Sequence, residues 1–106
     1  MALLEANNDN FSELIAGDDF KLVLFGATWC GPCKMYHPVV HEFAEKHPDV
    51  KILANDVDIS TNAAASFGIA SVPTTVAYKG GKEVARTSGM MPLEELEAFV
   101  TNAQNA

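Results

Sequence analysis

The chain has 106 residues, 48% of them hydrophobic, and its seven basic and fourteen acidic side chains give a net charge of −7. This length predicts a single domain, residues 1–106, which buries enough surface to fold without a metal or a structural disulfide. The acidic residues are scattered along the chain, which predicts a soluble monomer. Without a cluster of cations, nucleic-acid binding is not expected.

The N-terminal residues 1–9 contain no basic stretch, no long apolar run and no cleavage-type ending. No segment reaches the roughly 20 apolar residues that cross a bilayer. The sequence therefore predicts a protein without membrane contact and located in the cytoplasm, where thiols stay reduced unless they take part in redox chemistry. Removal of a leader would change this predicted location.

Hydrophobic patterning and turn residues predict an α/β fold. In chain order we expect a helix from about residue 8 to Gly17, a strand at 21–26, a long helix ending near His47, a strand at 50–58, a short helix at 61–67, a hairpin of strands at 75–78 and 83–87, and a last helix opening at Pro92. The nearly continuous apolar run at 21–26 is typical of a central strand covered on both faces. The order predicts a mixed sheet sandwiched between helices.

The two cysteines of the chain, Cys30 and Cys33, lie between a predicted strand and the long helix and enclose Gly31 and Pro32. Pro32 suits the first turn of a helix, where amide groups have no intrahelical partner. Cys30 is then held at the positive end of the helix, which lowers the pKa of its thiol and makes it the better nucleophile. We expect Cys33 to be more buried and to resolve the mixed disulfide formed at Cys30.

A zinc site is the main alternative interpretation of these cysteines. A CxxC pair supplies half of a zinc ligand set, and His37 and His41 follow Cys33 at four-residue steps. However, there is no second CxxC, Pro32 stiffens the loop, and Pro38 interrupts the helix between the histidines. The sequence therefore favours redox chemistry without a metal.

With these residues established, the sequence is seen to resemble the thioredoxin family over nearly its whole length. The active-site motif is matched by Trp29-Cys30-Gly31-Pro32-Cys33-Lys34, and the second signature, which contains a cis proline, by Val72-Pro73-Thr74. The resemblance implies a thioredoxin-like fold, with helices on both faces of the mixed sheet. It also implies reduction of disulfides in other proteins through a redox-active Cys30–Cys33 disulfide, with no bound cofactor. A flavin-containing, NADPH-dependent thioredoxin reductase would return the electrons.

The resemblance further implies a substrate-binding surface beside the dithiol. Its residues would be Trp29, Gly31, Pro32, Val72, Pro73, Gly89 and Met90. An extended substrate peptide would pair with the backbone next to Pro73. Asp58 would accept a hydrogen bond from the Trp29 indole, so that Trp29, Gly31, Pro32, Asp58 and Pro73 together support the active site. A different functional class, an interaction module that only holds partners on this surface, is disfavoured because binding alone does not need two cysteines.

Two positions depart from the family pattern. Where thioredoxins commonly carry a buried aspartate and an associated lysine, this chain has Leu24 and Ala54. The loss of both charges together leaves no unpaired buried ion. With no carboxylate at position 24, His37 is a candidate proton acceptor for Cys33, because the two side chains lie on one helix face and imidazole titrates in the right range. Water and the leaving thiolate of the substrate are the alternatives.

Overall fold

The computed structural model describes residues 3–106, which form five strands and four helices. Their bounds are β1 Leu3–Glu5, α1 Phe11–Ile15, β2 Lys21–Gly26, α2 Gly31–Lys46, β3 Lys51–Asp56, α3 Thr61–Ser66, β4 Thr74–Lys79, β5 Lys82–Ser88 and α4 Leu93–Gln104. The strand order is β1-β3-β2-β4-β5. The first three are parallel, whereas β4 and β5 run antiparallel to their neighbours, so the predicted mixed sheet is confirmed.

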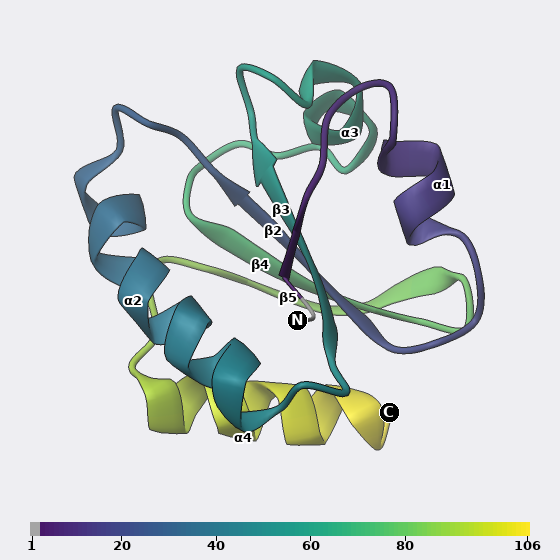
Figure 1. The fold of residues 1–106 in the computed structure, drawn as a ribbon, viewed down its shortest axis with the longest axis vertical. Helices are drawn as coiled ribbons and strands as arrows, with labels where there is room; N and C mark the ends of the chain where they lie inside the picture. Colours follow the sequence, from purple (N-terminus) through teal and green to yellow (C-terminus); the bar gives the residue numbers. More distant parts are fainter. Residues whose placement is uncertain (1–2) are drawn as a thin grey trace.

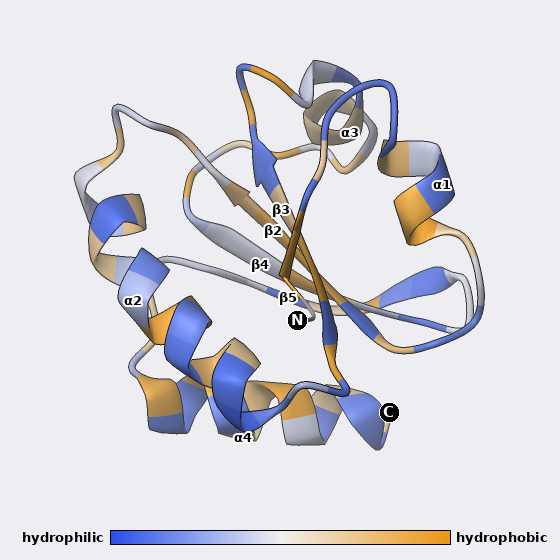
Figure 2. Ribbon diagram, in the orientation of Figure 1, coloured by the Kyte–Doolittle hydropathy of each residue, from blue (hydrophilic) through white to orange (hydrophobic). Residues whose placement is uncertain are grey.

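Helices cover both faces of this sheet, with α2 and α4 on one face and α1 and α3 on the other (Figure 1). Successive residues of β2 point to opposite faces, so Leu22 joins Phe43 and Leu96 under α2 and α4, whereas Val23 and Phe25 pack on the opposite side. Strand β2 is correspondingly apolar along most of its length, and the helices are apolar mainly where they face the sheet (Figure 2). Strand β2 is therefore the central strand that its continuous apolar run predicts.

The first element is a strand, not the helix that the sequence led us to expect. Strand β1 pairs in parallel with β3, from Leu3 opposite Ile52 to Glu5 opposite Ala54. Three residues show no hydrophobic period, and β1 is a strand only because β3 offers an open edge on that side. This addition makes β1 an edge strand of the sheet.

The N-terminal end of α1 has no side-chain cap. The helix begins at Phe11, and its N-cap residue Asn10 makes no side-chain hydrogen bond to the first turn. Instead, Oδ1 of Asn7 accepts hydrogen bonds from the amides of Asp9 and Asn10, both at 2.9 Å. The short polar residues thus order the turn before the helix and not the helix itself.

The hairpin of β4 and β5 turns at Gly80 and Gly81, with φ values of 63° and 77°. Two successive positive φ angles are the requirement of a tight hairpin turn, which explains both glycines. Because β4 is antiparallel to β2, its first residue Thr74 lies opposite Phe25, near the end of β2, and also opposite Ser88 at the end of β5. The segments on either side of the hairpin are therefore brought to the sheet end where α2 begins.

No helix within residues 3–106 is long and apolar enough to cross a membrane.

Candidate active site

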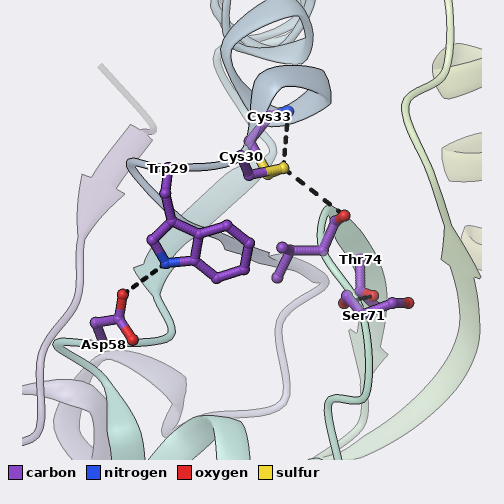
Figure 3. The surroundings of a disulfide bond; sticks show 7 residues. Trp29, Cys30, Cys33, Asp58, Ser71 and Thr74 are labelled. Carbon is purple, nitrogen blue, oxygen red and sulfur yellow. Dashed lines mark hydrogen bonds between the residues drawn. A yellow bond between two sulfur atoms is a disulfide. The ribbon is translucent and has the colours of Figure 1, made fainter.

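Cys30 and Cys33 form a disulfide bond at the start of α2, with their Cα atoms 5.2 Å apart. Cys30 is the N-cap residue with extended backbone, and Gly31 and Pro32 open the helix. The backbone amide of Cys33 donates a hydrogen bond to Sγ of Cys30 at 3.2 Å (Figure 3). This contact directs an amide and the positive end of the helix toward the Cys30 sulfur, an arrangement that stabilises negative charge there.

The burial of the two cysteines is the reverse of the expected order. Cys30 is only 5% exposed, whereas Cys33 is half-buried, so the prediction that Cys33 is the more buried is wrong. The Cys30 sulfur lies 3.7 Å from the carbonyl oxygen of Val72, and this segment covers it. Cys33 instead lines a pocket of about 880 Å³ between α2 and the ends of β1, β2 and β3. Exposure alone therefore does not identify the nucleophile.

The Trp29 side chain lies at the surface next to the disulfide and is 67% exposed. Its indole N–H donates a hydrogen bond to the Asp58 carboxylate at 2.9 Å, the contact that the family resemblance implies (Figure 3). Asp58 lies two residues beyond the end of β3, so the predicted strand was too long by these residues. A second hydrogen bond, from the Asp58 amide to Oδ1 of Asp56 at 2.8 Å, holds this turn in place.

The segment opposite the disulfide is anchored by hydrogen bonds at both sides of Pro73. The Val72–Pro73 peptide bond is cis, as the resemblance implies. Oγ1 of Thr74 donates to the carbonyl of Ser71 at 2.7 Å (Figure 3), and the amide of Gly89 donates to the carbonyl of Pro73 at 2.8 Å. Pro73 itself is buried, so it shapes the surface from beneath and is not an exposed part of it.

The remaining residues of the predicted surface lie around this segment. Trp29 and Val72 line a shallow hollow of about 320 Å³ together with Val57, Ile69, Ala70 and Ser71. Gly31 and Pro32 are exposed, and Met90, which follows Gly89, is 37% exposed. Met91 is buried in the core and contributes no such surface. The exposed Ile59, next to Asp58, is an apolar surface residue that the sequence analysis did not identify.

His37 is exposed, lines the same pocket as Cys33, and contacts His41 with ring centroids 4.3 Å apart. The two imidazoles thus pair with each other, one helical turn apart. Within residues 3–106, no group of three or more His, Cys, Asp or Glu side chains is arranged to hold a metal ion.

A buried hydroxyl pair lies on the same face of the sheet, and the sequence analysis missed it. Tyr36 is 4% exposed, and its hydroxyl lies 2.9 Å from Oγ1 of the fully buried Thr75. Burial raises the pKa of the Tyr36 phenol, and the hydrogen bond to Thr75 opposes this rise. Thr75 is paired with Leu24 across β2 and β4. A tyrosine on an apolar helix stripe was the available signal, because a buried phenol needs a partner.

The comparison with known proteins identifies the family. A family model described as thioredoxin matches residues 2–102. The chain belongs to the thioredoxin family. It is 44% identical over 98 residues to a thioredoxin of Alicyclobacillus acidocaldarius, covering 92% of this chain and 93% of the relative. It is 40% identical over 99 residues to thioredoxin-2 of Saccharomyces cerevisiae, covering 93% and 95%. The solved structure of oxidised mitochondrial thioredoxin 3 of S. cerevisiae matches with a TM-score of 0.84 at 33% identity, over 94% of each chain.

Family membership and the observed disulfide together give the biochemical class. The chain is a thiol–disulfide oxidoreductase that works by dithiol–disulfide exchange through Cys30 and Cys33. Thioredoxins generally reduce disulfide substrates and are recycled by thioredoxin reductase. In the exchange, two protein thiols become one disulfide, and two electrons and two protons pass to the substrate disulfide.

Proposed function

We propose that this thioredoxin-family chain reduces disulfide bonds of other proteins with Cys30 as the attacking cysteine and Cys33 as the resolving cysteine. The hydrogen bond from the Cys33 amide to Sγ of Cys30 at the start of α2 carries this assignment. A sulfur that lies at a helix N-terminus and accepts an amide hydrogen bond is stabilised in its negatively charged form. This thiolate is the form that attacks disulfides. Cys33, one turn inside the helix, has no such position at the helix end.

The exchange takes place in two steps. The Cys30 thiolate attacks one sulfur of the substrate, the substrate S–S bond breaks, and the other substrate sulfur leaves as a thiolate that takes up a proton. Cys33 then loses its proton and attacks Sγ of Cys30, which releases the second substrate sulfur and closes the Cys30–Cys33 bond observed here. In the closed form the Cα atoms are 5.2 Å apart, within the usual range for a disulfide.

The proposed docking surface for substrate is formed by Trp29, Val72, Gly89 and Met90, with Pro73 beneath it. Its support is that the sulfur of Cys30 lies 3.7 Å from the Val72 carbonyl, that Val72 and Trp29 line one hollow, and that the Gly89 amide is bonded to the Pro73 carbonyl. An extended substrate segment beside Val72 would place its own disulfide next to Cys30, and main-chain pairing accepts many sequences. The adaptable side chain of Met90 suits varied partners for the same reason.

We further propose His37 as the acceptor of the Cys33 proton. Its support is that His37 lines the pocket into which Cys33 opens and is accessible to solvent, so the proton can leave the site. The test is the pH dependence of single-turnover disulfide reduction in wild type, His37→Gln and His41→Gln. The His37→Gln variant should slow the resolution step and change its dependence on pH, with the His41→Gln control unchanged. Equal profiles for all three proteins would remove His37 from the mechanism.

Thioredoxin reductase is the proposed source of electrons, and we propose that the chain acts as a cytoplasmic monomer. A coupled assay tests the enzymatic part: NADPH consumption should require thioredoxin reductase, a disulfide-bonded protein and this chain together. The Cys30→Ser variant should abolish it. If partners still bound while wild type transferred no electrons, the chain would instead be an interaction module. Sedimentation of the oxidised protein and fractionation of the source cells test the monomer and the location.

A further inference from the structure

The Cys33 thiol has to be deprotonated before it can resolve the mixed disulfide. In the resolution step its thiol must become a thiolate, but apolar surroundings raise the pKa of a thiol because they disfavour the charged form. The Cys33 sulfur lies next to the backbone of Gly26, which has no side chain; a Cβ atom at this position would be 3.4 Å from the sulfur. Leu24, two residues earlier on β2, offers it no polar group. Stabilisation of the thiolate therefore has to come from another side chain of the pocket or from solvent.

Two buried hydroxyls under α2 belong to Tyr36 and Thr75, and they are bonded to each other. Tyr36 follows Cys33 by three residues on α2, so the two side chains are neighbours on one helix face. Both line the same pocket, whereas Thr75 is fully buried behind Tyr36. Thr75 pairs with Leu24, two residues before Gly26 on β2, and the Cys33 sulfur lies over Gly26.

The direction of the hydrogen bond between these hydroxyls can adapt, because either oxygen can donate. When Thr75 donates to the phenol oxygen, the phenolic hydrogen is free to point into the pocket. Thr75 has no comparable access, since only Tyr36 of the pair lines the pocket. A buried phenol stays protonated at neutral pH, so Tyr36 acts as a donor and not as a base.

We propose that the Tyr36 hydroxyl, positioned by Thr75, donates a hydrogen bond through the pocket to the Cys33 thiolate and so makes the resolving cysteine acidic enough to act. This inference rests on the proposed role of Cys33 and adds the group that supports it. The proton balance is complete: Cys33 releases its proton to His37 or solvent, Tyr36 keeps its own, and the thiolate attacks Sγ of Cys30. A hydrogen bond made only to the charged form lowers the pKa of a thiol.

Other ionisable groups also face this pocket and must be separated from Tyr36. They come from β1, α2 and the end of β3 and are Glu5, Lys34, His37, His41 and Asp56. Each remains in place when a single hydroxyl is removed, so a Tyr36→Phe exchange changes the hydrogen bond and leaves the charges as they are. Tyr78→Phe is the matched control, because its hydroxyl donates to the Gly81 carbonyl in the hairpin, away from the cysteines.

The experiment measures the acidity of Cys33 directly, without substrate. In a Cys30→Ser background, the rate of alkylation of Cys33 by iodoacetamide is followed against pH for Tyr36→Phe, Thr75→Val, Thr75→Ser and Tyr78→Phe. The proposal predicts that Tyr36→Phe raises the pKa of Cys33, with the acidity constant falling about tenfold, the size of one hydrogen bond to a charged group. Thr75→Val shifts the pKa in the same direction, Thr75→Ser restores it, and Tyr78→Phe leaves it unchanged.

In proteins that retain Cys30, resolution in Tyr36→Phe should be about threefold slower at pH 7, because the tenfold smaller thiolate fraction is partly offset by a more nucleophilic thiolate, and the slowing should disappear in alkaline solution. Urea unfolding of each variant records any loss of stability separately. A Tyr36→Phe variant that is less stable but has an unchanged Cys33 titration would overturn the proposal. Because this titration needs no substrate, it stays readable even if the chain fails to reduce proteins, an outcome that would contradict the proposed function alone.

Discussion

The order in which iodoacetamide labels the two cysteines of the reduced protein separates electrostatics from exposure. Cys33 is the more exposed cysteine, so accessibility alone predicts that it reacts first. The amide hydrogen bond to Sγ of Cys30 at 3.2 Å and the start of α2 predict the opposite order. Because the two effects oppose each other, the outcome shows which of them decides reactivity.

The size of the electrostatic effect follows from the contacts at Cys30. A helix N-terminus and one amide hydrogen bond to a charged sulfur contribute roughly 2 to 3 kcal/mol, and the burial of Cys30 offsets part of this. A net of about 1.4 kcal/mol makes thiolate formation about tenfold more favourable at Cys30. A more acidic thiol is a weaker nucleophile by about threefold over this range, so Cys30 should still react about three times faster near pH 7.

The assay is alkylation with limiting reagent, followed by peptide mapping, at a series of pH values from about 6 to 10. Above about pH 9.5 both cysteines are largely ionised, and the weaker nucleophile, Cys30, should then react more slowly than Cys33. We therefore predict that the order of labelling reverses as the pH rises. Labelling of Cys33 first at every pH would refute the electrostatic argument and with it the assignment of Cys30 as the nucleophile.

Three further predictions address the resolving cysteine, the docking surface and a buried cation. The Cys33→Ser variant should trap a mixed disulfide with a substrate protein, visible on a non-reducing gel, whereas Cys30→Ser should trap little; similar trapping by both would contradict the two-step scheme. Met90→Asp should raise KM for protein disulfides several-fold, because it puts a charge on an exposed apolar residue of the proposed docking surface; an unchanged KM would remove Met90 from that surface. The hydrogen bond from the buried Lys21 ammonium lowers the pKa of Asp19. The ion pair therefore stabilises the fold above about pH 4, and this stabilisation is lost as the pH falls through the lowered pKa of Asp19. Because Asp19 is largely exposed, Asp19→Asn should lower the free energy of unfolding in urea by less than about 1 kcal/mol at pH 7. The same exchange should change nothing near pH 2. A cost that grew toward low pH would contradict this sign.

The sequence predicts those parts of the fold that local patterns determine. The apolar run of β2 and the proline in the first turn of α2 are enough to place Cys30 at a helix start. The glycine pair of the hairpin predicts that β4 and β5 are antiparallel, and this connection brings the Val72 segment back to the cysteines. Only the family resemblance predicts the cis bond before Pro73 and the hydrogen bond between Trp29 and Asp58.

The parts that the sequence did not predict depend on contacts between distant residues. Strand β1 has no pattern of its own and exists through pairing with β3. The burial of Cys30 depends on Val72, which lies 42 residues along the chain. The hydrogen bond between Tyr36 and Thr75 requires both the rotation of α2 and the register that sets Thr75 opposite Leu24. Hydrophobic periodicity shows which face of a helix is buried, but it does not show which group a buried hydroxyl meets.

Stoichiometric electron transfer tests the central claim most directly, because it requires no reductase. The reduced protein is mixed with an equal amount of a disulfide-bonded protein, and the thiols of both are counted by mass spectrometry after alkylation. Dithiol–disulfide exchange predicts one Cys30–Cys33 disulfide formed for each substrate disulfide opened, and no complete transfer by Cys33→Ser. Opening of the substrate disulfide without formation of the Cys30–Cys33 bond, or equal transfer by the Cys33→Ser variant, would contradict it.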